Sequence, residues 1–139
     1  MQEKYNGQYI KEKEYVNWKS KRQFKELGIE DRIVELDQSS ATVELAAHVL
    51  GCQPRDIAKT LAFDVDGDAI VIVAVGDARI DNAKYKNTFG KKAKMLHGDQ
   101  VEARTGHAIG GVCPFGLKEG VKVYLDQSLK QLEYVYPAC

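Results

Sequence analysis

The sequence predicts an α+β domain built around a mostly antiparallel or mixed β-sheet. The chain has 139 residues and a mass of 15.5 kDa, which is enough for one domain. Two apolar segments, 61–65 and 69–75, flank Asp66-Gly67, a dipeptide that is a strong local signal for a β-hairpin. Helical and strand patterns are mixed along the chain, with too few regular strand–helix alternations for a doubly wound parallel sheet.

The first 28 residues differ from the rest in composition, because basic side chains alternate there with aromatic ones. The spacing of Phe24 and Leu27 before Gly28 predicts an amphipathic helix that ends at this glycine. We therefore expect residues 1–28 to form a basic, aromatic helical segment that packs on a domain spanning 29–139. An arm that binds nucleic acid is the alternative.

The remaining elements follow from caps and apolar runs. A short strand is expected at 33–36, and a helix through 43–49 has Ser40 or Thr42 as its cap and Gly51 as its stop. After the hairpin, Asp81 should cap a helix that Gly90 closes, and a second short helix should run to Gly106. Segments 121–125 and 132–136 are expected to be the closing strands.

Charge and cysteine content exclude several classes of protein. The 20 basic and 20 acidic residues cancel, so a nucleic acid would have to be met by a local patch. The apolar run at 69–75 is far shorter than the roughly 20 residues of a membrane span, and no leader pattern opens the chain. Cys52, Cys113 and Cys139 form neither a disulfide framework nor a zinc pattern. We expect a cytoplasmic protein.

Common catalytic and metal-binding motifs are absent from the sequence. The nucleophile elbow, the zinc-protease motif and the phosphate-binding loop are all missing. The aspartates around Gly67 do not form a calcium loop, since Val75 stands where that loop requires glutamate. His48, in a predicted helix, and His97, in a predicted turn, have no partner ligand at useful spacing. We therefore expect no metal.

A run of lysines gives the chain its best local candidate for contact with a phosphate backbone. The run falls within residues 84–94 and consists of Lys84, Lys86, Lys91, Lys92 and Lys94. A solvated helix face is the other interpretation of such a run.

Residues 106–116, GHAIGGVCPFG, contain four glycines, a proline and no charged side chain. Adjacent glycines let the backbone adopt positive φ and let its N–H groups approach a ligand closely. Such a loop can present amides to an oxyanion or a carbonyl group, or it can simply turn a corner between two strands. Composition alone favours the corner.

Four motifs in this order resemble a known family. They are Lys59-Thr60-Leu61, Arg104-Thr105-Gly106, the Gly-Gly-x-x-Pro-x-Gly run at 110–116 and Val123-Tyr124-Leu125-Asp126. Their order and spacing are similar to those of the YbaK/EbsC family from about residue 33 to residue 139. This family includes the Cys-tRNA(Pro) deacylases and the editing domain inserted in bacterial prolyl-tRNA synthetases.

The resemblance implies a mixed, barrel-like β-sheet surrounded by helices, and a trans-acting hydrolase that cleaves the ester of a mischarged aminoacyl-tRNA without metal or cofactor. The family's essential lysine corresponds to Lys59, which taken alone reads as an ordinary surface lysine. Amides near Gly110 and Gly111 would stabilise charge on the carbonyl oxygen. Water, a ribose hydroxyl or a substrate thiol would be the nucleophile.

The implied substrate is tRNA(Pro) carrying alanine or cysteine, with prolyl-tRNA synthetase as a partner to test. Lys84, Lys91 and Lys92 are the expected tRNA contacts. The family also continues past the position of Cys139, so we expect this chain to lack a C-terminal tail.

Several pocket positions depart from relatives, which leaves the edited amino acid open. Val34 replaces a tyrosine, His107 an aromatic residue, and Cys113 and Ala138 each a serine. The resemblance places these four in the pocket together with Thr60, Thr105, Pro114 and Gly116.

Two alternatives stay open. Cys113 is interpreted as a small residue that lines the pocket, and the alternative hypothesis is that its thiol is a nucleophile. A tRNA or amino-acid sensor of the same fold, without turnover, is the alternative function.

Overall fold

The computed structural model describes residues 3–5, 8–10, 20–33 and 42–137. Most of the strand predicted at 33–36 lies outside these ranges, as do the candidate cap Ser40 and the predicted pocket residues Val34 and Ala138. None of the helices in the described ranges is long and apolar enough to cross a membrane.

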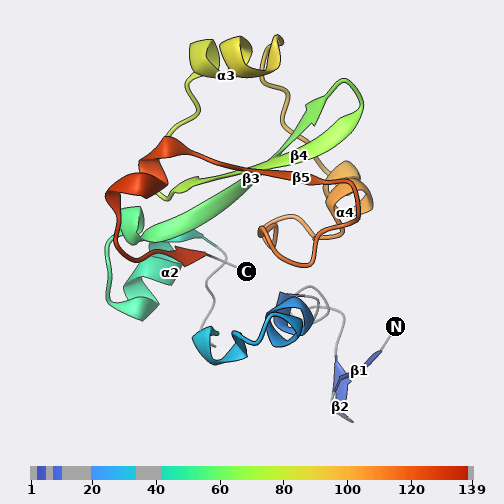
Figure 1. Cartoon of the computed structure of the whole chain (residues 1–139), viewed down its shortest axis with the longest axis vertical. Helices are drawn as coiled ribbons and strands as arrows, with labels where there is room; N and C mark the ends of the chain where they lie inside the picture. Colours follow the sequence, from blue (N-terminus) through green and yellow to red (C-terminus); the bar gives the residue numbers. More distant parts are fainter. Residues whose placement is uncertain (1–2, 6–7, 11–19, 34–41, 138–139) are drawn as a thin grey trace.

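A four-stranded mixed sheet forms the centre of the molecule (Figure 1). Its central strands β3 (Ile57–Val65) and β4 (Asp68–Val75) are antiparallel. Strand β5 (Lys122–Leu125) runs parallel to β4, and β6 (Tyr136–Pro137) runs parallel to β3, which gives the order β5-β4-β3-β6. The sheet is strongly twisted and curls, with helices around it, so the predicted α+β fold with a barrel-like mixed sheet is confirmed.

The predicted hairpin is present, and its turn has the expected chemistry. Val65 pairs with Asp68, so Asp66 and Gly67 are the two loop residues. Both have positive φ, 55° and 89°, which is the backbone that a tight hairpin of this kind requires. Asp64 Oδ1 accepts a hydrogen bond of 3.1 Å from the Gly67 N–H.

The three helices predicted between residues 42 and 106 are present, and each ends at the predicted glycine. Thr42 caps α2 (Val43–Leu50), and Asp81 caps α3 (Asn82–Phe89), each accepting a backbone N–H with its side chain. Glycines in the left-handed conformation end α2, α3 and α4 (Asp99–Thr105). In chain order these residues are Gly51, Gly90 and Gly106.

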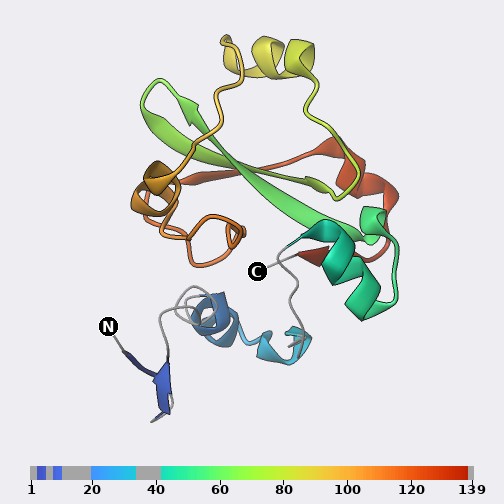
Figure 2. The same ribbon diagram turned by 180° about the vertical axis from the view of Figure 1, so that it is seen from behind.

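Side chains cover both faces of the β3–β4 pair. One face carries Phe63, Ile70 and Ile72, which pack with Tyr85 and Phe89 of α3. The other carries Ala62 and Val71, which pack with α4 and with segments 112–117 and 121. Double coverage explains why 69–75 is continuously apolar rather than alternating. In Figures 1 and 2, α3 lies on one side of the sheet, and the loop at 106–117 lies on the other.

The N-terminal region is helical only in part, which corrects the prediction for residues 1–28. Strands β1 (Glu3–Tyr5) and β2 (Gln8–Ile10) form an antiparallel hairpin where helix was expected. Within the described residues, the predicted helix covers 20–26, and the turn after it reaches Gly28, whose φ is 72°. A 3₁₀ turn, η1 (Glu30–Arg32), follows it. Aromatic residues of high strand propensity give the physical reason for a hairpin.

The predicted strand at 132–136 is wrong except at Tyr136. Asp126 accepts a 3.0 Å hydrogen bond from the Ser128 N–H and caps a 3₁₀ helix, η3 (Gln127–Gln131). The Leu132 N–H still bonds to the Leu129 carbonyl, so the chain becomes extended and joins β3 only at β6. A second 3₁₀ helix, η2 (Pro54–Asp56), leads into β3.

Gly76 sits where the end of β4 meets α2 and η2, and it provides a test of this packing. A Cβ added there would collide with the Pro54 carbonyl oxygen and with Val43 Cγ1. We expect Gly76→Ala to lower the free energy of unfolding by about 3 kcal/mol, as overpacking does at its upper range. Gly51→Ala is the control, because its Cβ meets nothing and only the left-handed backbone costs about 1 to 2 kcal/mol. Equal losses in urea unfolding would contradict this packing.

Candidate functional site

The glycine-rich segment 106–116 forms an irregular loop directly after α4. Gly106, Gly110 and Gly116 adopt φ of 86°, 81° and 63°, so each holds a conformation that other residues rarely adopt. The Gly111 N–H donates a 2.9 Å hydrogen bond to the Ala108 carbonyl, which closes a turn around Gly110. Gly110 is exposed at the tip. Of the two expected amide donors, the Gly111 N–H is therefore engaged within the loop, whereas Gly110 lies in its exposed part.

Thr105 anchors the start of this loop from inside α4. Its side chain is fully buried, and its Oγ1 donates a 2.6 Å hydrogen bond to the Val101 carbonyl. The same oxygen accepts from the His107 N–H at 3.2 Å. Thr105 thus fixes the direction in which the chain leaves the helix.

His107 joins the two ends of the loop. It is 0% exposed, and its Nε2 lies 2.7 Å from the Phe115 carbonyl oxygen. A carbonyl oxygen can only accept, so Nε2 carries the proton in this bond. The imidazole thus links the start of the loop to its end through this hydrogen bond. Its expected contact with the substrate stays a prediction.

Cys113 lies beneath the loop rather than on its surface. Its side chain is 0% exposed, and its Sγ lies 3.1 Å from the Ser20 hydroxyl and 3.4 Å from the Phe115 carbonyl oxygen. A nucleophilic thiol must reach a substrate, and reactive cysteines are partly exposed and close to cations. The burial of Cys113 argues against a nucleophilic thiol, and its expected place as a small pocket residue stays a prediction.

Lys59 lies near the start of β3, and its ammonium group donates a hydrogen bond to the Ala78 carbonyl. It pairs with Ala74, so alternation puts it on the face of Leu61 and Phe63. The glycine loop packs on the opposite face, through Val112 and Leu117. No hydrogen bond or ion pair joins Lys59 to that loop within the described part of the chain.

Thr60, the next residue, shares the face against which the glycine loop packs. It pairs with Val73. On the same face of the sheet, the neighbouring pair is Ala62–Val71, which the loop covers. Its hydroxyl oxygen is buried and has no hydrogen-bond partner among the described residues. A buried hydroxyl without a partner is costly, so a ligand or a water is the usual explanation. Thr60 thus places a buried hydroxyl on the loop side of the sheet, and its predicted role in substrate binding stays a prediction.

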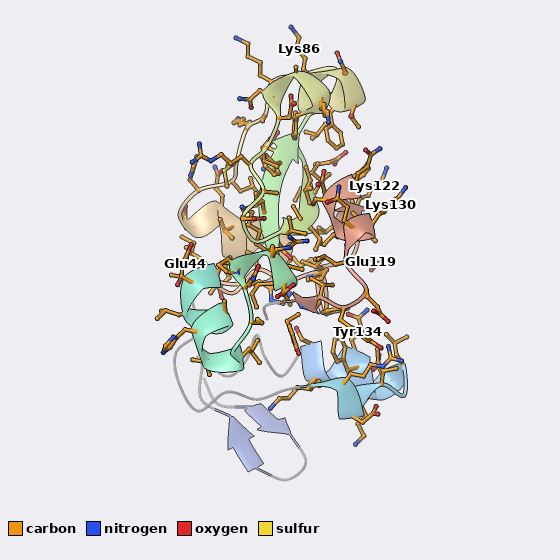
Figure 3. All side chains as sticks on the ribbon, turned by 90° about the vertical axis from the view of Figure 1, so that its left-hand side faces the viewer. Glu44, Lys86, Glu119, Lys122, Lys130 and Tyr134 are labelled. Carbon is orange, nitrogen blue, oxygen red and sulfur yellow. The ribbon has the colours of Figure 1, made fainter. Side chains whose placement is uncertain are left out.

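The predicted tRNA-binding lysines lie away from this loop. Lys84 is on α3, while Lys91 and Lys92 follow it; all three are exposed. Lys91 forms an ion pair with Asp66 at the hairpin turn. Figure 3 shows α3, with Lys86 extending into solvent, at the opposite end of the molecule from helix 20–26. The structure therefore does not bring these lysines to the glycines.

Residues to which the sequence analysis gave no role secure α4 and the loop. Arg104, beside Thr105, donates to Asp64 Oδ2 at 2.5 Å and to the Gly67 carbonyl at 2.6 Å. The Arg104 bond, aided by the Gly67 N–H, lowers the pKa of the Asp64 carboxyl from its ordinary value. The presence of Arg104 in the second motif was the one available signal. Ser20 and Gln23, which contact the loop from helix 20–26, carried no signal at all.

No group of three or more histidine, cysteine or acidic side chains comes together within the described ranges in a way that would hold a metal ion. Asp126, in the fourth motif, is instead a helix cap. Hydrogen bonds from Ser128 and its neighbours lower the pKa of the Asp126 carboxyl from its ordinary value.

Comparisons with known proteins agree on one family. Residues 37–139 match the family model described as an aminoacyl-tRNA editing domain. The uncharacterized protein YwhH of Bacillus subtilis (strain 168) is 51% identical over 117 residues, which is 84% of this chain and 74% of that protein.

Two further relatives have names that refer to prolyl-tRNA synthetase or its editing. A proline–tRNA ligase of Lysinibacillus sphaericus (strain C3-41) is 30% identical over 103 residues, covering 73% of this chain but 18% of the ligase. A crystal structure of a candidate trans-editing enzyme for prolyl tRNA synthetase aligns with a TM-score of 0.79 and 28% identity, covering 88% of this chain and 79% of that one.

The link between Asp64 and Arg104 predicts a specific dependence of stability on pH. Because the folded pKa of Asp64 is lowered, its contribution is present above the unfolded pKa of about 3.9 and is lost as pH falls through the folded value. Asp64→Asn should therefore be less stable than wild type in urea at pH 7, and the gap should close toward pH 3. The exposed Asp77→Asn is the control. A gap that stayed constant with pH would contradict the link.

Proposed function

The chain belongs to the family of aminoacyl-tRNA editing domains, and we propose that it acts in trans as a deacylase that hydrolyses the ester of a mischarged tRNA. We further propose that the substrate is tRNA(Pro) carrying alanine or cysteine. The likeness to proline–tRNA ligases and to a candidate trans-editing enzyme for prolyl tRNA synthetase supports this choice. A tRNA substrate would place the protein in the cytoplasm, with prolyl-tRNA synthetase as a partner.

The observation that carries the proposal is the exposed turn at Gly110 on a loop without charged side chains. Ester hydrolysis builds negative charge on the carbonyl oxygen, and fixed backbone N–H groups aimed at that oxygen lower the barrier. The Gly110 amide is the candidate donor, because the Gly111 amide already bonds to Ala108. The main chain of such a loop can approach a small aminoacyl group closely.

The reaction needs only water and the substrate. The oxygen of water attacks the ester carbon, the bond to the ribose oxygen breaks, and that oxygen takes up a proton. The products are the free amino acid and tRNA. Since His107 and Cys113 are buried within the loop, we assign no general base or nucleophile to them. We propose that a hydroxyl or thiol of the substrate helps to move the proton.

We propose that Lys59 binds the substrate's terminal phosphate. An ammonium group has three N–H donors, so the bond to the Ala78 carbonyl leaves two for a phosphate. Its place on the face opposite to the loop's contacts favours this role over one at the acyl oxygen. Thr60, with its buried hydroxyl on the loop side, is the proposed partner of the aminoacyl or ribose group.

Lysine-dependent deacylation tests the proposal. Release of labelled amino acid from Ala-tRNA(Pro) and Cys-tRNA(Pro) should be catalysed by wild type and fall by about 100-fold in Lys59→Ala, because the phosphate contact that positions the ester is lost. Lys122→Ala, an exposed lysine on β5, is the matched control and should keep full activity. Full activity in folded Lys59→Ala would remove the lysine from the mechanism. Tight tRNA binding without release from either substrate would favour the sensor.

The lysines after α3 predict how salt affects the reaction. Replacing Lys91 and Lys92 together by alanine should raise KM and reduce the salt dependence of log KM by about one unit of slope per lost phosphate contact. Lys122→Ala with Lys130→Ala is the control pair, because both are exposed on the C-terminal segment (Figure 3). An unchanged salt slope in the first pair would place the tRNA elsewhere.

A further inference from the structure

Helix 20–26 contacts the glycine loop although it lies outside the residues that match the editing-domain model, 37–139. Three of its side chains reach the far end of the loop, and they are Ser20, Gln23 and Phe24. The loop has no regular secondary structure, so its conformation depends on such contacts. The proposed function does not account for this helix.

Gln23 makes the most specific of the three contacts. Its Oε1 accepts a 2.5 Å hydrogen bond from the backbone N–H of Gly116. A backbone N–H can only donate, so the amide of Gln23 must present its oxygen here. Gly116 has φ of 63° and ends the loop, so the bond fixes the backbone where the chain leaves it.

Ser20 and Phe24 hold the two residues on either side of Pro114. Ser20 is 4% exposed, and its hydroxyl lies 3.1 Å from Cys113 Sγ and 3.4 Å from the Phe115 carbonyl oxygen. The ring of Phe24 packs edge-on against Phe115 with 4.4 Å between the centroids. His107 reaches the same Phe115 carbonyl from the other end of the loop. The helix and the loop's own start therefore converge on one residue.

We propose that helix 20–26 positions the editing site, with Gln23 as the positioning residue for the loop that carries Gly110. The inference rests on the proposed function for its catalytic readout. The helix acts through the backbone and touches no reacting atom, so it sets how often the Gly110 amide is aimed at the carbonyl oxygen. Loss of the Gln23 acceptor lowers kcat and leaves KM for the tRNA nearly unchanged, because the tRNA contacts lie elsewhere.

Two variants of equal size separate the hydrogen bond from the packing. Gln23→Leu keeps the volume and removes the acceptor, whereas Gln23→Glu keeps an oxygen at the same reach. We expect kcat for Ala-tRNA(Pro) or Cys-tRNA(Pro) to fall about tenfold in Gln23→Leu and to stay within about twofold of wild type in Gln23→Glu. Gln131→Leu, at an exposed glutamine of η3, is the control and should leave kcat unchanged.

Hydrogen exchange of the peptide 106–117 provides a readout that needs no activity. It should speed up in Gln23→Leu and remain slow in Gln23→Glu, with the peptide covering α3 unchanged in both. Wild-type protein that releases no amino acid would overturn the proposed function while this exchange result still supports the loop contact. Unchanged kcat and unchanged exchange in Gln23→Leu would overturn the inference, as would equal losses in both variants.

Discussion

The central constraint is that both faces of the β3–β4 hairpin must be covered. The pair is apolar on either side, and each face recruits a different part of the chain. Tyr85 of α3 packs on one face against Phe63 of β3 and against Phe89 of α3, with the rings tilted and centroid distances of 5.2 and 4.6 Å. The other face is covered by α4 and by the loop that follows it. The loop that carries the proposed site is therefore part of the layer that covers this face.

Hydrogen bonds from residues that are far apart in sequence hold α4 and the glycine loop in place. Arg104 ties α4 to the hairpin turn through Asp64 and the Gly67 carbonyl. His107 and helix 20–26 then hold Phe115 and Gly116. Between these anchors the tip at Gly110 is left exposed. Rigid ends and an open tip are what a site built from backbone amides requires.

Local chemistry could be predicted from the sequence, whereas contacts between distant segments could not. Helix caps such as Thr42 and Asp81 and the Asp66-Gly67 turn depend on neighbouring residues, so their patterns were sufficient. The segment 132–136 had a strand-like pattern, but the cap at Asp126 imposed a 3₁₀ helix before it. Gln23 reaches Gly116 across 93 residues, and no periodicity signals such a bond. The resemblance supplied Lys59 and the glycines but not their placement around the sheet.

The central claim is that the loop side of the sheet binds the aminoacyl end of tRNA. It is tested most directly by titrating ¹⁵N-labelled protein with an adenosine that carries alanine through a stable 3′-amide in place of the ester. We expect the backbone amide signals of Thr60 and Gly110 to shift at the same ligand concentrations, while the chemical shifts of α3 stay unchanged. Shifts confined to α3 or to the β5 edge, with Thr60 and Gly110 unmoved, would contradict it.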